Sequence, residues 1–368
     1  IDRVDRVAVV EPGVVTNALC ERVAEEGLMY AGYPMSTETS FIGGNVATNA
    51  GGGKVIRYGN TRRHVLGLEV VLADGEVIEV GGRFRKSTWG YDLLNLMIGS
   101  EGTLGVFTRI VLNLISAPPK TMDVLVPFPN TETAVGAVAE VIVSEGVVPE
   151  TVEFMDRICF LESSKLHEVT LPIQDTDQAG AFLIIQLRGD TQEELEELCR
   201  QAGETCLAQG AIDVFVAVSA QHSRDIWKIR EHYGEGVARA GPNAYFTSDT
   251  IVPFSKIPEM MRELKKMEQK YGIAIPTVGH IADGNLHSAL YKPDAVSVEE
   301  WPDKAEEIFD EMSRIALEMG GAGSGEHGVG TLKRSLFLKT KTKTELALMR
   351  GLKQVFDPKG ILNPGTML

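Results

Sequence analysis

The chain has 368 residues, 43% of them hydrophobic and 24% charged, so it is long enough for two domains with ample buried core. Its formal net charge of -15 at pH 7 argues against nucleic acid or an anionic membrane surface as a partner. No apolar run is long enough to span a bilayer, and no signal-peptide pattern opens the chain. The four cysteines form no CxxC pair, which disfavours iron–sulfur and zinc-ribbon sites and predicts reduced thiols in the cytoplasm.

Residues 1–118 are dense in glycine and predict short elements joined by tight turns. A short helix is expected over residues 17–27, because apolar side chains recur at helical spacing and Gly27 follows as a stop signal. Two β-rich runs flank Asp74-Gly75, which is a hairpin signal. A further strand follows the turn "IGSEGTLG", and Pro118-Pro119 then predicts a domain boundary.

From about Lys120 the pattern changes to alternating strands and amphipathic helices. Strands are expected over residues 121–128, 179–189 and 211–218, and helices over residues 131–146 and 191–210. This order predicts an antiparallel sheet backed by helices, and therefore an α+β fold. Further helices are expected over residues 255–272, with Ser255 as the cap and Pro258 in the first turn, and over residues 298–319 and 344–356.

The stretch "HIADGNLH" places His280 and His287 on either side of the turn-forming residues Asp283, Gly284 and Asn285. Positions 280 and 287 would face opposite sides of a straight strand, so the two imidazoles converge only if the chain folds back between them. Gly284 permits that turn. The two histidines are either ligands of a metal site or ordinary polar residues of a loop.

A third metal ligand is expected from "GSGEHGVG", in which Glu326 and His327 are neighbours. Neighbouring side chains of an extended segment point apart, so both residues are not expected to bind one ion. We therefore expect Glu326 to be the third ligand and His327 to lie beside the metal as an acid–base group. Two histidines and one carboxylate with open positions suit zinc, iron(II) or manganese acting as a Lewis acid on a substrate oxygen.

Residues 323–328 also satisfy the dinucleotide-binding pattern GxGxxG. That interpretation is rejected, because a helix is expected before the pattern where the motif requires a strand. Glu326 would also lie where a pyrophosphate needs neutral backbone amides.

Residues 43–53 are better candidates for binding a flavin or a phosphate. Their glycines expose backbone N–H groups, and Asn45, Thr48 and Asn49 supply hydrogen bonds without charge. The alternative is a glycine-rich loop that packs against its own sheet.

Several stretches together resemble the FAD-linked 2-hydroxy-acid dehydrogenases of the vanillyl-alcohol oxidase superfamily, the group of D-lactate dehydrogenase, D-2-hydroxyglutarate dehydrogenase and the FAD-binding subunit of glycolate oxidase. They are "VAVVEPGVV", "FIGGNVATNAGG", "YGNTRRHVLGLEVVLADGEVI", "GYDLLNLMIGSEGTLGVFT", "HIADGNLH", "GEHGVG" and "GILNPGTML". The resemblance implies a PCMH-type FAD-binding domain over residues 1–118 and a substrate domain with an antiparallel sheet over residues 119–319. Residues 320–368 would return to the flavin. Relatives carry a further segment for the FAD diphosphate before Ile1, which we expect to be missing here.

The same resemblance implies which residues form the site. His280, His287 and Glu326 match the metal ligands, His327 matches the active-site base, and Arg230 matches an arginine that binds the substrate carboxylate. From the residues alone, Arg230 is either that group or a salt bridge on a helix surface. The residues implied to line FAD are Pro34, Ser36, Ile42, Gly43, Gly44, Asn45, Thr48, Asn49, Gly51, Gly52, Tyr58, Gly59, Glu101, Gly102, Gly105, Val106 and Asn363.

The resemblance implies metal-assisted oxidation of a small D-2-hydroxy acid, of the D-lactate or glycolate type, to the 2-oxo acid, with hydride transfer to N5 of FAD. Ala289 and Thr247 replace polar residues of some relatives, which disfavours a dicarboxylic substrate. The electrons would pass to an electron-transfer flavoprotein, an iron–sulfur subunit or a quinone. We expect a cytoplasmic homodimer, associated with a membrane only through partner subunits. The alternatives are a non-catalytic or truncated assembly subunit and a metal-dependent hydrolase.

Overall fold

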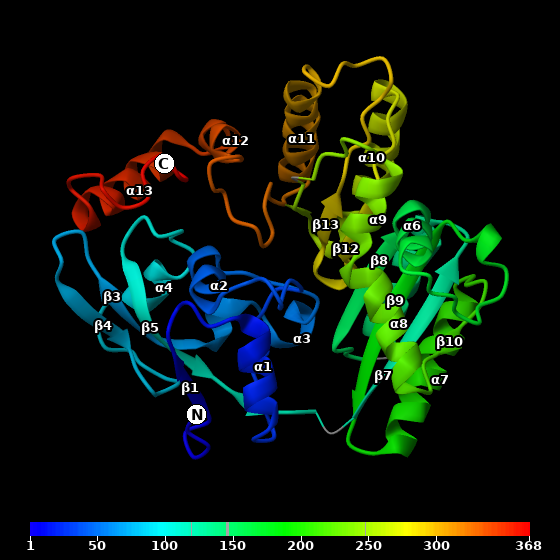
Figure 1. Ribbon diagram of the computed structural model, residues 1–368, viewed down its shortest axis with the longest axis horizontal. Coiled ribbons are helices and arrows are strands. Elements are labelled where there is room, and N and C mark those ends of the chain that lie inside the picture. The colour runs from blue at the N-terminus through cyan, green and yellow to red at the C-terminus, as the bar shows by residue number, and fades with distance from the viewer. Residues whose placement is uncertain (119, 145–146, 247) are drawn as a thin grey trace. The chain divides into compact units, whose positions relative to one another are not determined.

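The computed structural model describes residues 1–118, 120–144, 147–246 and 248–368. The chain divides into two compact units (Figure 1). Unit 1 comprises Ile1–Ala117 and Glu326–Leu368, and unit 2 comprises Pro118–Gly325. Among the described residues, no helix is both long and apolar enough to cross a bilayer. Thr247, which bears on the predicted substrate, and Pro119 of the predicted boundary lie outside the described residues.

Unit 1 contains a four-stranded antiparallel sheet in the order β1-β5-β3-β4. Its strands are β1 (Val7–Val10), β3 (Val65–Val71), β4 (Val77–Gly81) and β5 (Val106–Asn113), and β2 (Leu28–Met29) pairs separately with β6 (Ile115–Ser116). The β3–β4 hairpin predicted at Asp74-Gly75 is confirmed, and Gly75 has a φ of +89° that suits glycine.

The helices of unit 1 are α1 (Thr16–Ala24), α2 (Ile42–Thr48), α3 (Val55–Tyr58), α4 (Leu93–Met97), α12 (Arg334–Thr340) and α13 (Lys343–Phe356). Helix α1 confirms the helix predicted over residues 17–27, and α13 confirms the last predicted helix. Helix α2 falls in the glycine-rich region that we interpreted only as a loop or as a site that binds a flavin or a phosphate. The hydrophobic core of this unit lies between the four-stranded sheet and α1 and α2.

Unit 2 is built on a seven-stranded sheet in the order β10-β7-β9-β8-β12-β13-β11. Its strands are β7 (Lys120–Phe128), β8 (Thr151–Asp156), β9 (Ala181–Gly189), β10 (Phe215–Val216), β11 (Thr250–Ile251), β12 (Thr277–His280) and β13 (Asn285–Ser288). All neighbouring strands are antiparallel, which confirms the predicted type of sheet. Strand β8 was not predicted.

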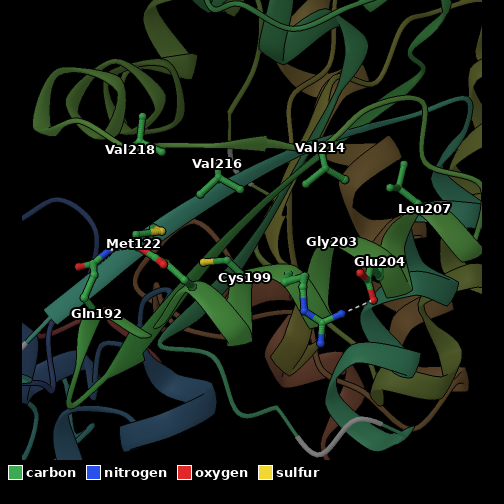
Figure 2. Close-up of a pocket in the computed structure, with 11 residues that line it drawn as sticks. Met122, Gln192, Cys199, Gly203, Glu204, Leu207, Val214, Val216 and Val218 are labelled. Carbon is green, nitrogen blue, oxygen red and sulfur yellow. Dashed lines mark hydrogen bonds and ion pairs between the residues drawn. The ribbon is translucent and has the colours of Figure 1, made fainter. Parts of the chain in front are cut away.

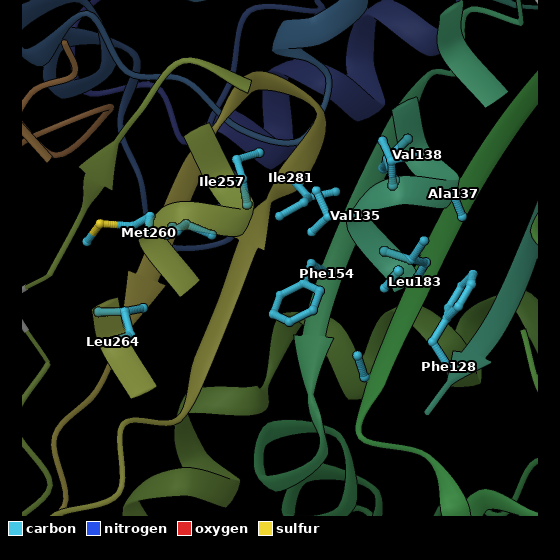
Figure 3. Packing of buried hydrophobic residues seen from close by; sticks show 14 of the residues in the cluster. Phe128, Val135, Ala137, Val138, Phe154, Leu183, Ile257, Met260, Leu264 and Ile281 are labelled. Atoms are coloured by element: carbon cyan, nitrogen blue, oxygen red, sulfur yellow. The ribbon is translucent and has the colours of Figure 1, made fainter. Parts of the chain in front are cut away.

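Helices cover both faces of this sheet. Against one face pack α5 (Thr131–Ala139), α7 (Gln192–Ala208), α10 (Ile257–Tyr271) and α11 (Trp301–Glu318) (Figure 3). Against the other pack α6 (Arg157–Leu166), α8 (Ala220–Glu231) and α9 (Tyr233–Ala240). Successive side chains of β8 alternate between the two cores, since Phe154 belongs to the first and Met155 to the second.

Three element predictions need correction. Strand 211–218 shortens to β10, because only Phe215 and Val216 pair with β7. Helix 131–146 ends as an α-helix at Ala139 and continues as a π-turn to residue 144, while residues 145 and 146 lie outside the described residues. Ser255 is not the cap of α10, because residues 254–256 form a 3-10 turn and Lys256 precedes the helix. Pro258 lies in the first turn, as predicted.

A concavity of about 570 Å³ lies at the β10 edge of the sheet, against α7 (Figure 2). Apolar side chains dominate its lining, including Met122, Leu207, Val214, Val216 and Val218. None of the predicted metal, flavin or catalytic residues lines it.

Candidate metal and flavin sites

His280 and His287 are brought onto one face of the sheet by the β12–β13 hairpin. His287 lies opposite Val278, and residues directly opposite one another share a face of the sheet. Val278 and His280 are two positions apart on β12 and also share a face, so the two histidines point to the same side. The two imidazole centroids are 5.3 Å apart. The chain folds back at Gly284, as predicted: its φ is +88°, and a Cβ there would lie 2.0 Å from the carbonyl oxygen of Val252.

The neighbouring strand β8 places a buried carboxylate next to His280. Glu153 lies opposite His280, and its two oxygens are 2.8 and 2.9 Å from Nδ1 of His280. Nη2 of Arg230 on α8 forms an ion pair of 2.6 Å with the same carboxylate, and Nε donates a hydrogen bond of 2.9 Å. Burial raises the pKa of Glu153, but His280 and Arg230 outweigh that effect and hold the pKa at about 2. The carboxylate is therefore charged at neutral pH.

The contact with Glu153 determines which nitrogen of His280 can coordinate a metal. Because a carboxylate can only accept a hydrogen bond, Nδ1 carries a proton and Nε2 is the ring nitrogen that can coordinate a metal. Metal-binding histidines usually donate a hydrogen bond from the second ring nitrogen to a carboxylate, a backbone carbonyl or water, which orients the ring and raises its basicity. The donor chemistry at His280 therefore fits a divalent cation.

A second buried carboxylate, Asp249, lies near His287. Its Oδ1 is 3.8 Å from Nδ1 of His287, and it accepts hydrogen bonds from Asn285 (2.9 Å) and from Ser324 (2.6 Å). The backbone N–H of Gly325 donates to the carbonyl oxygen of Asp249 at 2.8 Å. Residues 324 and 325, just before Glu326, are thus hydrogen-bonded to Asp249, which directly precedes β11.

Glu326 and His327 begin the C-terminal part of unit 1. They lie in bends rather than in an extended segment, and Nε2 of His327 is 3.6 Å from Oε1 of Glu326. The expectation that these neighbours point apart is therefore wrong, because the chain is not extended there. A Cβ on Gly51 would lie 3.5 Å from Oε2 of Glu326, so this carboxylate lies against the glycine-rich loop of unit 1. Their roles as ligand and base stay predictions.

Arg230 is not the surface salt bridge that was one interpretation of it. Its side chain is 4% exposed, and the ion pair with Glu153 lies inside unit 2. Binding of a substrate carboxylate by this guanidinium stays a prediction.

Several candidate flavin residues of unit 1 lie in α2 or in the loop that follows it. Gly43 and Gly52 are required by packing, since a Cβ on them would lie 2.5 Å from Cβ of Pro12 and 2.6 Å from the carbonyl oxygen of Tyr33. Gly44 differs, because a Cβ there would meet nothing within 4 Å. A glycine inside a helix costs about 1 kcal/mol relative to alanine, so a requirement for close approach of a ligand would explain it.

A second loop reaches α2 at Glu101. Its N–H donates to the carbonyl oxygen of Ala47 at 2.8 Å, and its carboxylate accepts from the N–H groups of Val329 and Gly330, both at 2.7 Å. Nδ2 of Asn363 donates to the carbonyl oxygen of Glu101 at 2.6 Å. Glu101 and Asn363 both have positive φ, of 51° and 42°, which indicates that this junction is tightly constrained.

The remaining predicted flavin residues divide by their surroundings. Ile42 is fully buried in the core, and Asn45 donates to Oγ1 of Thr16 at 2.8 Å, so both support α2 from inside. Gly105 packs against Val70. The other predicted flavin residues also belong to unit 1. Thr48 is in α2, Tyr58 in α3 and Val106 in β5, and the residues outside helices and strands are Pro34, Ser36, Asn49, Gly51, Gly59 and Gly102.

Two family models together cover most of the chain. The model described as the FAD binding domain matches residues 1–81, and the model described as the C-terminal domain of FAD linked oxidases matches residues 117–367. The chain belongs to the FAD-linked oxidase family.

Relatives of this FAD-linked oxidase match it along its whole length. It is 35% identical to D-lactate dehydrogenase of Anaerostipes hadrus, covering 99% of this chain and 76% of that protein. It is also 35% identical to glycolate oxidase subunit GlcD of Bacillus subtilis (strain 168), covering 100% and 76%. The crystal structure of p-cresol methylhydroxylase with substrate bound has the same fold, with a TM-score of 0.75 and 18% identity over 100% of this chain and 77% of that one. The predicted family and fold class are confirmed.

Sequence reasoning on this FAD-linked oxidase missed Glu153 and gave Asp249 no role. Glu153 stands in "TVEFMD" between the apolar residues Val152 and Phe154. A carboxylate flanked by apolar side chains in a buried strand must find a partner, since an unpaired buried charge is very costly. That signal could have indicated Glu153, but the partner could not be identified because His280 and Arg230 are distant in sequence.

Proposed function

We propose that this FAD-linked oxidase oxidises a small D-2-hydroxy acid, such as D-lactate or glycolate, to the 2-oxo acid. The observation that carries the proposal is the buried Glu153–His280 pair beside His287, in a chain of this family. FAD, when bound, would supply the hydride acceptor for oxidation of the substrate α carbon. A divalent cation of the zinc, iron(II) or manganese type, when bound, supplies Lewis acidity to the substrate oxygens.

His280, His287 and Glu326 hold that cation. Glu153 keeps the proton of His280 on Nδ1, so Nε2 is the coordinating atom. Glu326 follows Gly325 by one peptide bond, which keeps their Cα atoms about 3.8 Å apart. Gly325, the residue before Glu326, donates a backbone hydrogen bond to Asp249, which lies near His287 in unit 2. Two nitrogens and one carboxylate oxygen leave positions open for substrate.

His327 accepts the hydroxyl proton of the substrate as general base. Its side chain is 54% exposed and lies next to Glu326. Arg230 orients the substrate carboxylate, since a guanidinium can present paired N–H donors to a carboxylate while Glu153 fixes its position.

Unit 1 holds the flavin through the N-terminal turn of α2, the loop at Glu101–Gly102 and Asn363. Gly44 supports this assignment, because a Cβ there would meet no atom of the described residues within 4 Å. The chain has no CxxC pair that would suit an iron–sulfur cluster, so the electrons leave through a separate flavoprotein, iron–sulfur subunit or quinone.

A monocarboxylic substrate is favoured by Ala289. It follows His287 by two positions, is 2% exposed, and offers no hydrogen bond to a second carboxylate. The hydrolase alternative has no support from a family whose members bind FAD.

Anaerobic mixing of the FAD-loaded protein with D-lactate tests the proposal. The visible flavin absorbance should bleach as the flavin is reduced, and D-2-hydroxyglutarate should bleach it more slowly.

His327→Ala should slow bleaching by about 100-fold or more, because a general base contributes at least that factor. The matched control, His222→Ala, removes a histidine of α8 outside the candidate site and should react at the parent rate. No bleaching by any D-2-hydroxy acid would overturn the function, and parent-rate bleaching by His327→Ala would overturn the base.

A further inference from the structure

A second group of metal-ligating side chains lies where α6 meets the α8–α9 junction. One ring nitrogen each of His167 and His232 and a carboxylate oxygen of Glu235 lie within 4.8 Å of one another. The two imidazole centroids are 5.1 Å apart, and Nδ1 of His232 is 3.2 Å from Oε1 of Glu235. We propose that these three residues bind a divalent cation of the zinc class that cross-links the end of α6 to the start of α9. This site is separate from His280 and does not depend on the proposed function.

The close approach of the two helices explains why the side chains meet. A Cβ on Gly236 would lie 2.7 Å from the backbone nitrogen of Ser163, so only glycine allows α9 to come this near to α6. Ser163 also donates from Oγ to the carbonyl oxygen of Ile229 at 2.7 Å. His167 is one helical turn after Ser163, and His232 is one turn before Gly236, so the crossing aligns the two imidazoles.

The donor set and its spacing suit zinc. Tetrahedral zinc with bonds of about 2.1 Å separates its ligand atoms by roughly 3.4 Å, which is near the 3.2 Å between His232 and Glu235. One ring nitrogen of His167 lies within 4.8 Å of both of these ligand atoms. Nε2 of His167 is buried and has no hydrogen-bond partner in the described structure, and a metal ion would satisfy such a nitrogen. Two nitrogens and one carboxylate oxygen leave a fourth position for water.

The exposure of the group is consistent with an ion that enters from solvent. The side chains of His232 and Glu235 are 41% and 64% exposed, whereas His167 is half-buried at the end of α6. Binding would tie two helices that cover the same face of the sheet, and we expect it to raise the melting temperature.

Zinc titration of chelator-treated protein, followed by competition with a chromophoric chelator, tests the site. His232→Ala and Glu235→Gln should each bind one zinc ion fewer than the parent protein in the titrated range. Loss of a direct ligand should weaken binding by more than the roughly 10- to 100-fold that loss of an outer-shell partner costs. His222→Ala should bind as many ions as the parent. Equal stoichiometry in the parent and His232→Ala would overturn the proposal, whatever happens at His280.

A second pair of variants tests the helix crossing. Gly236→Ala forces a Cβ against Ser163 and should weaken zinc binding at this site, whereas Gly234→Ala, whose Cβ would meet nothing within 4 Å, should not. The double variant His280→Ala/His287→Ala should still take up the ion between α6 and α9. Loss of zinc from that double variant, with zinc retained in His232→Ala, would assign all binding to the other histidines.

Discussion

The two units present their candidate sites by different means. In unit 2 the site consists of side chains: Glu153 is fully buried and is paired with His280 and with Arg230. In unit 1 the site is mostly backbone, made of α2, the loop at Glu101 and several residues of positive φ. The stability of a charged side chain in a core depends on its charged partners, whereas the position of a backbone group depends on the local conformation of the chain. The two sites should therefore fail differently when they are mutated.

Breaking the charge cluster of unit 2 should have the largest effect. Glu153→Gln leaves Arg230 buried without its anion and should lower the free energy of unfolding by about 3–5 kcal/mol. Denaturant unfolding monitored by circular dichroism measures the change. Glu69→Gln is the control, because its ion pair of 2.9 Å with Arg109 is on the surface of unit 1 and should cost at most about 1 kcal/mol. Similar losses in both variants would show that burial does not distinguish the two pairs.

Acid should weaken the same cluster. The pKa of Glu153 falls from 4.5 to about 2 on folding, so its contribution is present above pH 4.5 and is lost as the pH falls towards 2. The loss should be roughly 3 kcal/mol at the lower limit. Burial raises the pKa of Asp156 from 3.8 to about 6. The charged form of Asp156 therefore destabilises the fold, and this cost is relieved as the pH falls from about 6 towards 3.8.

Comparison with Glu153→Gln isolates the first effect, because Asp156 is present in both proteins. The difference in free energy of unfolding between the parent and the variant should shrink as the pH falls from 4.5 to about 2. A difference that stays constant over this range would contradict the assignment of the charge to Glu153.

The smallest effects on stability are expected in the backbone site of unit 1. Gly43→Ala should lower the free energy of unfolding by about 1–3 kcal/mol, because its Cβ would collide with Pro12. Gly44→Ala should leave it unchanged or raise it by up to about 1 kcal/mol. If Gly44 approaches the flavin, Gly44→Ala should nonetheless weaken FAD binding by about tenfold or more, equivalent to about 1.4 kcal/mol. FAD fluorescence titration measures this, and unchanged affinity would remove Gly44 from the flavin site.

Local signals in the sequence determined several parts of this molecule. Asp74-Gly75 predicted the β3–β4 hairpin, Gly284 permitted the reversal between His280 and His287, and a last helix that ends before Pro358 was predicted where α13 lies. Each of these depends on residues close together in the chain, where turn preferences and hydrophobic period act directly. Family membership was predicted in the same way, from short motifs in a fixed order.

Only the tertiary structure revealed what surrounds those motifs. The pairing of Glu153 with His280 requires β8 to lie beside β12, and the meeting of His167 with His232 requires α9 to approach α6 at Gly236. No local preference encodes such contacts, because the partners are distant along the chain and the pairing is decided by how buried charges and apolar faces are satisfied together. The sequence therefore specified which groups could do chemistry, and the packing of the sheet and its helices decided which neighbours control them.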